Sequence, residues 1–490
     1  MDRRTFLQNA SATAAALSLP STLLAARPAA ARRPNLLFIM ADQWRRPAFS
    51  YTGQEPVKTP NLDILAAHSV VFNRAYCTVA LCSPSRSSMV TGLFAQTTGV
   101  LTVTTPLRKD TPTIAHPFND AGYATGYIGK WHLGGGGPLT PVAPDLRGGF
   151  QYWLGSECSH HNFQMEHTDT AGNLVNTKGY VPDLETGYAI DFIQKNKARP
   201  FFLFLSWAPP HPGTALPTPT NYEPMEEVYS APKADCDLYH DVLPTRPNVS
   251  MDFDSAPHTR HVLSNPGVPP AAGYYGAIAA IDRNVGKLLA TLDAEGLRDN
   301  TIVVFTSDHG EMMMSHALFG KKVFWEESIG VPFMVSWPGV IKPAHCDELF
   351  NGPDIAPTLT ALAGLKMPQP VEGRDFSPAL HGQAFTGPDA TFSAYFDEQR
   401  PDVPTIHSWR CIRTKNYSYA VIGSIFPAQA AKYVAGTKVP VTRHLFDMEA
   451  DPYQLHPIDV AKEGASIAAE LGVKLRAHLT AHNDFFAQLV

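Results

Sequence analysis

The sequence predicts an α/β protein with a large mixed sheet flanked by helices, followed by a smaller antiparallel sheet and a terminal helix. Two patterns support this class. As far as Phe376, continuous apolar runs typical of buried strands are separated by segments of helical periodicity. After Phe376, short strand-like segments follow one another before a last amphipathic stretch. The 490 residues are enough for one large domain and one smaller one.

Three runs are the predicted strands of the large sheet. They span Asn35–Met40, Phe201–Leu205 and Thr301–Thr306, and they are mostly apolar, as expected for strands covered on both faces. Polar residues follow each run almost at once. Because sites of open α/β sheets form at the carboxyl ends of strands, we expect these three strand ends to converge.

Helices are predicted between the strands. Asn61–Ser69 has helical spacing and begins with an asparagine that can cap it. Ser83–Leu93 is expected to open a second helix, and Tyr274–Ala294 has the apolar spacing of an amphipathic helix. A further helix is expected to begin at Asp354.

The pattern after Phe376 predicts a separate subdomain. Strands are expected near residues 391–396, 409–413 and 417–422, and a helix from Ala465 to about Leu489. We therefore place a main domain at residues 32–376 and a C-terminal subdomain at residues 377–490.

The N-terminus resembles a twin-arginine export signal. Arg3 and Arg4 precede an Ala- and Leu-rich run that ends near Ala26, and Ala29–Ala31 offers a cleavage site of small residues. The run is short and only mildly apolar, so a removable leader at residues 1–31 is favoured over a stable membrane span; an uncleaved amphipathic anchor is the alternative. We expect a periplasmic or secreted protein.

Composition excludes some classes of function. The net charge is −6 and no basic tract occurs, which disfavours nucleic-acid binding. The six cysteines lack the Cys-x-x-Cys spacing of structural zinc sites. A disulfide such as Cys158–Cys236 stays open, and the sequence leaves the subunit number open as well.

The segment Cys82–Gly92 reads Cys-Ser-Pro-Ser-Arg-Ser-Ser-Met-Val-Thr-Gly. It resembles the signature of sulfatases, whose cysteine is oxidised to Cα-formylglycine by a maturation enzyme. The resemblance extends over nearly the whole chain after the leader and implies an alkaline-phosphatase-like fold. An aldehyde hydrate suits covalent catalysis, because a second hydroxyl on the same carbon can expel sulfate after the first has attacked sulfur.

Polar residues after two predicted strands suggest a metal site. Asp42-Gln43 and Asp308-His309 offer hard oxygen ligands and one imidazole, which suit Ca²⁺, Mg²⁺ or Mn²⁺ better than zinc. The resemblance assigns these four residues and Cys82 to one divalent cation, and Ca²⁺ is the first expectation. Many sulfatases have Asp-Asp and Asp-Asn at the two pairs, so this sequence leaves the identity of the metal open.

The resemblance also implies roles for charged residues near the nucleophile. Gly129–Gly134 matches a Gly-Lys-Trp-His-Leu-Gly motif. Lys130 would bind an oxygen of formylglycine or sulfate, and His132 would take the proton that expels sulfate. Arg86, one helical turn beyond Cys82, would hold the hydrated aldehyde.

Two later segments complete the implied site. His211 follows a predicted strand and matches the general acid that protonates the departing alcohol. Lys321 matches the sulfate-binding lysine, with Lys322 as the second choice. The polar stretches Cys158–Phe163 and Asn221–His261 are candidates for shaping a substrate pocket, although packing and solvated turns are an equal alternative for any one residue there.

The implied function is metal-dependent hydrolysis of an aryl or carbohydrate sulfate ester. One alternative is a phosphonate monoester or phosphodiester hydrolase with the same nucleophile and a similar metal set. Another is a binding protein in which Cys82 stays unconverted.

Overall fold

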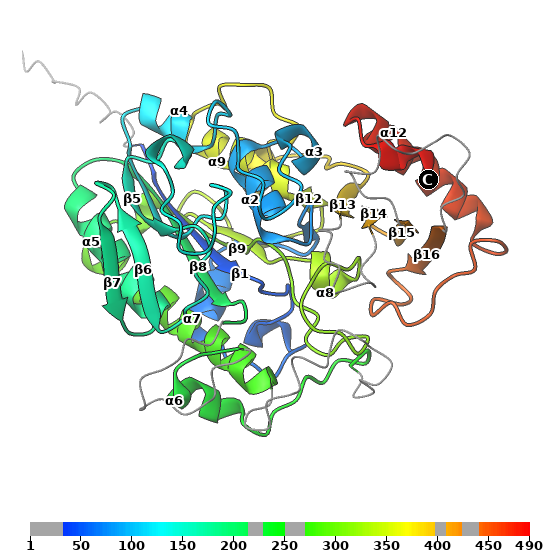
Figure 1. Ribbon diagram of the computed structural model, residues 1–490, viewed down its shortest axis with the longest axis horizontal. Helices are drawn as coiled ribbons and strands as arrows, with labels where there is room; N and C mark the ends of the chain where they lie inside the picture. Colours follow the sequence, from blue (N-terminus) through cyan, green and yellow to red (C-terminus); the bar gives the residue numbers. More distant parts are fainter. Residues whose placement is uncertain (1–32, 214–228, 250–269, 397–407, 424–440) are drawn as a thin grey trace, which may run out of the picture. The chain divides into compact units, whose positions relative to one another are not determined.

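The computed structural model describes residues 33–213, 229–249, 270–396, 408–423 and 441–490. The described residues from Pro34 onward belong to one compact unit (Figure 1). The predicted export signal and parts of the 221–261 stretch lie outside the described residues. Within the described ranges, no helix is both long and apolar enough to cross a bilayer.

The three predicted strands are neighbours at the centre of a ten-stranded sheet, in the order β11-β2-β10-β9-β1-β8-β4-β5-β6-β7. β1 (Asn35–Asp42) pairs in parallel with β8 (Phe201–Pro210) on one side and with β9 (Thr301–Ser307) on the other. β4 (Ala124–Lys130) continues the parallel set beyond β8. The convergence of their carboxyl ends is therefore confirmed. The remaining strands are β2 (Val70–Phe72), β5 (Tyr152–Ser156), β6 (Gln164–Asp169), β7 (Leu174–Lys178), β10 (Phe333–Ser336) and β11 (Ala344–Cys346).

Alternate residues of β1 belong to two different cores, which explains the continuous apolar runs. Leu36 and Phe38 lie in a cluster with residues of α2 (Cys82–Thr91), α4 (Ala115–Asp120) and α9 (Ile355–Leu362). Leu37 and Ile39 lie in a cluster with residues of α1 (Pro60–Ala67), α5 (Val181–Asn196) and α7 (Pro270–Ala294). Helices thus cover both faces of the sheet (Figure 1).

The predicted helices are present, with shifted ends. α2 begins at Cys82 itself and ends before Gly92, which has φ +75°, and a Cβ there would lie 2.8 Å from Val371 Cγ1. Only glycine fits such a position without strain. α1 and α7 begin earlier than expected, at prolines that suit the first turn of a helix.

The predicted second sheet is antiparallel and consists of β13 (Thr391–Tyr395), β14 (Ser408–Arg413), β15 (Tyr417–Gly423) and β16 (Val441–Asp447). α12 (Ala465–Ala481) packs Leu471 and Leu475 against Ile412 and Val421 of this sheet. The helix ends earlier than predicted, because Asn483 has φ +54° and Asp484 caps a separate turn at Phe485–Gln488.

These features confirm the predicted fold class, whereas the boundary at residue 376 stays a prediction. The smaller elements are β3 (Ala75–Tyr76), β12 (Phe350–Asn351), α3 (Ala95–Thr98), α6 (Lys233–Cys236), α8 (Glu326–Ile329), α10 (Ser377–Leu380) and 3₁₀ turns at Ser50–Thr52, Pro144–Leu146, Asp237–Tyr239, Arg298–Asn300 and Gly352–Asp354.

Candidate active site

The predicted site residues meet at the carboxyl ends of the central strands. Asp42 ends β1, Lys130 ends β4, His211 follows β8 and Asp308 follows β9. Cys82 is the first residue of α2, so the start of a helix also faces this region. The free backbone N–H groups of a helix start favour an anion.

Four of the five predicted metal ligands form one buried group. The ligand atoms of Asp42, Cys82, Asp308 and His309 lie within 4.8 Å of one another. His309 Nε2 is 3.6 Å from Oδ1 of both aspartates, and both carboxylates are fully buried. Two buried carboxylates facing each other fit a divalent cation, whose charge would offset their mutual repulsion.

Gln43, the fifth predicted ligand, borders this group. Its backbone N–H donates to Asp308 Oδ1 at 3.2 Å, and its Oε1 accepts from Lys321 Nζ at 2.7 Å. Its side-chain amide donates to Glu311, whose other oxygen accepts from the backbone N–H of Gly320 at 2.6 Å. Glu311 therefore fixes both Gln43 and the loop that leads into Lys321.

Arg86 contacts both carboxylates of the candidate metal site. Its Nε donates to Asp308 Oδ2 and its Nη2 to Asp42 Oδ2, both at 2.9 Å. Its Nη1 donates to Lys130 O at 2.6 Å and to Ser206 Oγ at 2.9 Å. The guanidinium thus bridges the two aspartates and ties the ends of β1, β4, β8 and β9 together.

Two ammonium groups approach Cys82. Its Sγ lies 3.4 Å from Lys321 Nζ, 3.7 Å from Lys130 Nζ and 3.3 Å from His309 Nε2. Burial and Asp42 raise the pKa of the thiol, but Lys130, Lys321 and His309 outweigh them and lower it to about 6. A negative charge is therefore favoured at the position of this side chain.

Lys321 rather than Lys322 reaches the site. Lys322 Nζ lies 5.8 Å from the centre of the Tyr395 ring, and its backbone has φ +79°. The sequence analysis preferred Lys321 over Lys322, and the position of the Lys321 ammonium group near Cys82 agrees with that preference.

Two histidines lie near the site with lowered pKa values. Burial and Lys130 hold the pKa of His132 well below its usual range, and burial and Lys321 do the same for His211. His211 Nδ1 donates to the carbonyl of Pro212 at 2.8 Å, so its Nε2 is the nitrogen available for exchange of a proton. Among the described residues, His132 Nδ1 has no hydrogen-bond partner.

Sequence reasoning did not assign roles to three residues that belong to this arrangement: His160, Ser206 and Glu311. His160 Nε2 lies 3.0 Å from Lys130 Nζ. The polar segment Cys158–Phe163 pointed to its neighbourhood, but no spacing distinguished it from His161. The position of Glu311, two residues after His309, was the only signal for that side chain.

All six cysteines are free thiols, so the disulfide left open above is absent from the structure.

The sulfatase family model matches residues 34–365, which include every residue of this site. The chain belongs to the sulfatase family. It is a sulfuric ester hydrolase by class. The family model for the C-terminal part of N-sulphoglucosamine sulphohydrolase matches residues 314–481 of this sulfatase.

Relatives resemble this sulfatase over most of its length. An ulvan-active sulfatase of Formosa agariphila is 34% identical over 468 residues, covering 93% of this chain and 82% of the relative. An endo-4-O-sulfatase of Bacteroides thetaiotaomicron is 29% identical over 502 residues, covering 91% and 92%. A solved structure from work on glycosaminoglycan metabolism by Bacteroides thetaiotaomicron has a TM-score of 0.76 and 26% identity over 93% of this chain and 98% of that one. The alkaline-phosphatase-like fold implied by the resemblance is thereby confirmed.

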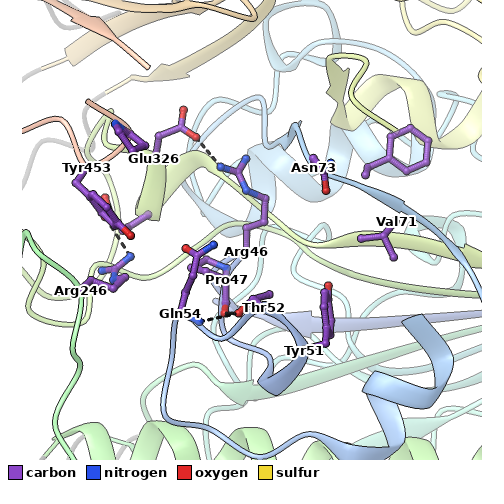
Figure 2. A pocket seen from close by; sticks show the side chains of 13 residues that line it. Arg46, Pro47, Tyr51, Thr52, Gln54, Val71, Asn73, Arg246, Glu326 and Tyr453 are labelled. Atoms are coloured by element: carbon purple, nitrogen blue, oxygen red, sulfur yellow. Dashed lines mark hydrogen bonds and ion pairs between the residues drawn. The ribbon is translucent and has the colours of Figure 1, made fainter. Parts of the chain in front are cut away.

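A separate pocket of about 310 Å³ is lined by Arg46, Arg246, Glu326 and Tyr453, among other residues of this sulfatase (Figure 2). Arg46 Nη2 pairs with Glu326 Oε2 at 2.7 Å, as the dashed line in Figure 2 marks. Arg413 of β14 holds the other oxygen of Glu326 at 2.7 Å. This buried carboxylate therefore links the second sheet to the segment that follows Lys321.

Proposed function

We propose that this sulfatase hydrolyses the sulfate ester of a carbohydrate, with residue 82 converted to formylglycine and one divalent cation bound beside it. The observation that carries the proposal is the surroundings of Cys82 Sγ, which has two lysine ammonium groups and the Asp42–Asp308–His309 group within reach. An ester that bears a negative charge needs such a site, because charge builds up further as the ester bond breaks.

Formylglycine, as its hydrate, supplies one hydroxyl that attacks sulfur and a second whose proton loss expels sulfate. Lys130 and Lys321 bind the sulfate oxygens and keep the group next to residue 82. His211 gives a proton from Nε2 to the departing alcohol; because Nδ1 keeps its hydrogen for Pro212, this step uses the imidazolium, which the negative charge of the bound ester favours against the effect of burial. His132 receives the proton that is released when sulfate leaves.

The metal would be held by Asp42, Gln43, Asp308 and His309, together with residue 82. When bound, it supplies polarisation of a sulfate oxygen and a lowered pKa for the attacking hydroxyl. Oxygen ligands predominate in this set, so Ca²⁺ is the proposed ion and Mg²⁺ or Mn²⁺ are the alternatives. Arg86 offsets part of the charge of both aspartates through their Oδ2 atoms.

The names of the relatives favour a carbohydrate substrate over a simple aryl sulfate. One relative is an ulvan-active sulfatase and another is an endo-4-O-sulfatase, and each aligns with more than nine-tenths of this chain. The twin-arginine pattern at residues 1–31 supports export, where sulfated polymers are accessible. A formylglycine-generating enzyme is the implied partner, and it would act before export of the folded chain.

Rates with matched substrates test this function. Purified protein made with a maturation enzyme should accelerate hydrolysis of an aryl sulfate more than that of the corresponding aryl phosphonate, relative to the uncatalysed reactions. A panel of sulfated glycans should then give a higher kcat/KM than the aryl sulfate. A larger acceleration of the phosphonate would reassign the protein to the phosphonate hydrolases.

A further inference from the structure

A second histidine lies against the proposed general acid. The rings of His160 and His211 are stacked, with centroids 4.1 Å apart and planes at 13°. Nε2 of His160 is 3.0 Å from Lys130 Nζ and 3.7 Å from Cys158 Sγ. His160 therefore contacts two groups of the proposed mechanism through two different parts of its ring.

The hydrogen bond to Lys130 fixes the state of His160. An ammonium group only donates, so His160 Nε2 accepts and the ring carries its single hydrogen on Nδ1. Burial and Lys130 hold the pKa of His160 well below its usual range, which keeps this ring neutral. Lys130 Nζ in turn lies between this nitrogen and Asp42 Oδ2, which is 2.6 Å away.

A neutral stacked ring suits a neighbour that must carry a proton. A neutral His160 ring places no charge against the His211 ring when that ring takes up a proton, whereas a second imidazolium would repel it. The stack also restricts rotation of the His211 ring, and the bond from His211 Nδ1 to Pro212 fixes the same ring at its edge. Nε2 of His211 is thereby held in one direction.

We infer that His160 is a positioning residue that orients the His211 ring by stacking and holds Lys130 beside residue 82 by accepting its hydrogen bond. This inference rests on the proposed function, because His211 and Lys130 act in that mechanism. It adds a residue that contributes without contacting the reacting atoms.

Two substitutions separate the two contacts. His160→Gln places an amide oxygen near the position of Nε2 and removes the ring, so it keeps an acceptor for Lys130 and abolishes the stack. His160→Phe keeps an aromatic face against His211 and removes the acceptor. His161→Gln is the matched control, because His161 pairs with Glu166 Oε2 at 2.6 Å instead of with the site.

The readout is kcat/KM for a series of aryl sulfates whose leaving groups differ in pKa. His160→Gln should lose roughly ten- to a hundredfold with the poorest leaving groups and little with the best, because misplacement of an acid matters most where protonation is needed. His160→Phe should lose a similar factor with every leaving group, since Lys130 acts on the sulfate. His161→Gln should follow the wild-type line.

A double variant shows whether His160 acts through His211. If it does, His160→Gln combined with His211→Ala should lose no more on poor leaving groups than His211→Ala alone. Equal slopes of log(kcat/KM) against leaving-group pKa for wild type and a folded His160→Gln would overturn the inference, and so would additive losses in the double variant. Should His160→Gln unfold, the His160→Phe variant decides, because wild-type kcat/KM in that protein refutes the contact to Lys130. Full activity of Cys82→Ala would instead refute the proposed function itself.

Discussion

Arg86 donates a hydrogen bond of 2.9 Å to Asp42, so the arginine one helical turn beyond Cys82 contacts a carboxylate of the proposed metal site. The resemblance had assigned this arginine to the hydrated aldehyde. Its side chain donates hydrogen bonds to Asp42, Asp308, Lys130 O and Ser206. Arg86 is thus placed to offset the charge of two buried carboxylates as well as to support the nucleophile.

Replacing Arg86 should destabilise the protein as well as inactivate it. Arg86→Ala leaves Asp42 and Asp308 buried without their partner, and removal of one member of such a group costs about 3–5 kcal/mol. Denaturant unfolding in metal-free buffer measures this loss, and Ca²⁺ should restore part of it by neutralising the same carboxylates. An inactive Arg86→Ala protein with wild-type unfolding free energy would show that the arginine serves only the aldehyde.

Lys321 and Lys322 form a matched pair for mutagenesis. Lys321→Ala should lower kcat/KM by about 10²–10³-fold, the loss typical of removing one donor to developing charge. Lys322→Ala should stay close to wild type, because its ammonium lies over Tyr395 instead of near Cys82. Steady-state kinetics with one aryl sulfate is sufficient, and the reverse order of the two variants would refute the assignment.

Glu326 should make the protein sensitive to acid. Burial raises the pKa of this carboxyl, but Arg413 and Arg46 outweigh it and lower the pKa to about 2. Because the pKa is lowered in the folded state, ionised Glu326 stabilises the fold at pH values above 4.5, the value in the unfolded chain. This contribution of about 3 kcal/mol is lost as the pH falls towards 2.

Measurement of the unfolding free energy from about pH 6 down to about pH 3 checks this expectation. Wild type should lose stability more steeply than Glu326→Gln. Glu470→Gln is the control, since Glu470 is exposed and pairs with Lys474 on the surface of α12. Parallel curves for wild type and Glu326→Gln would show that the buried pairs contribute nothing in this range.

Removal of the metal should abolish activity and lower the thermal midpoint. A cation that binds only the folded state adds about 2.7 kcal/mol at a concentration of 100 times its Kd. Ca²⁺ should restore the midpoint of chelated protein at lower concentration than Mg²⁺ or Mn²⁺, and Asp308→Asn should lose this response. Calorimetry with each ion measures the thermal midpoint of wild type and of Asp308→Asn. Full turnover by protein shown to be free of metal would disprove the site.

The fold was largely predictable because the strands that build the site are buried on both faces. Phe201–Leu205 and Thr301–Thr306 carry their signal locally, in runs of apolar residues. The end of α12 was not predictable, because the left-handed Asn483 stops the helix although apolar residues continue to Leu489.

The residues of the site also include some that the sequence could identify and one that it could not. Cys82 and Lys130 lie in segments with recognisable motifs, so both could be named from the sequence. His160 could not, because its importance comes from stacking on a residue about fifty positions away, and the adjacent His161 has the same chemistry but faces Glu166. Contacts between distant segments determine which of two equivalent side chains joins a site.

The state of residue 82 tests the central claim most directly. Peptide mass spectrometry of protein produced with and without a formylglycine-generating enzyme measures the converted fraction, because formylglycine is lighter than cysteine. The account predicts that hydrolysis of sulfate esters rises in proportion to this fraction and is absent from Cys82→Ala. Full activity in protein whose residue 82 is entirely cysteine would contradict it.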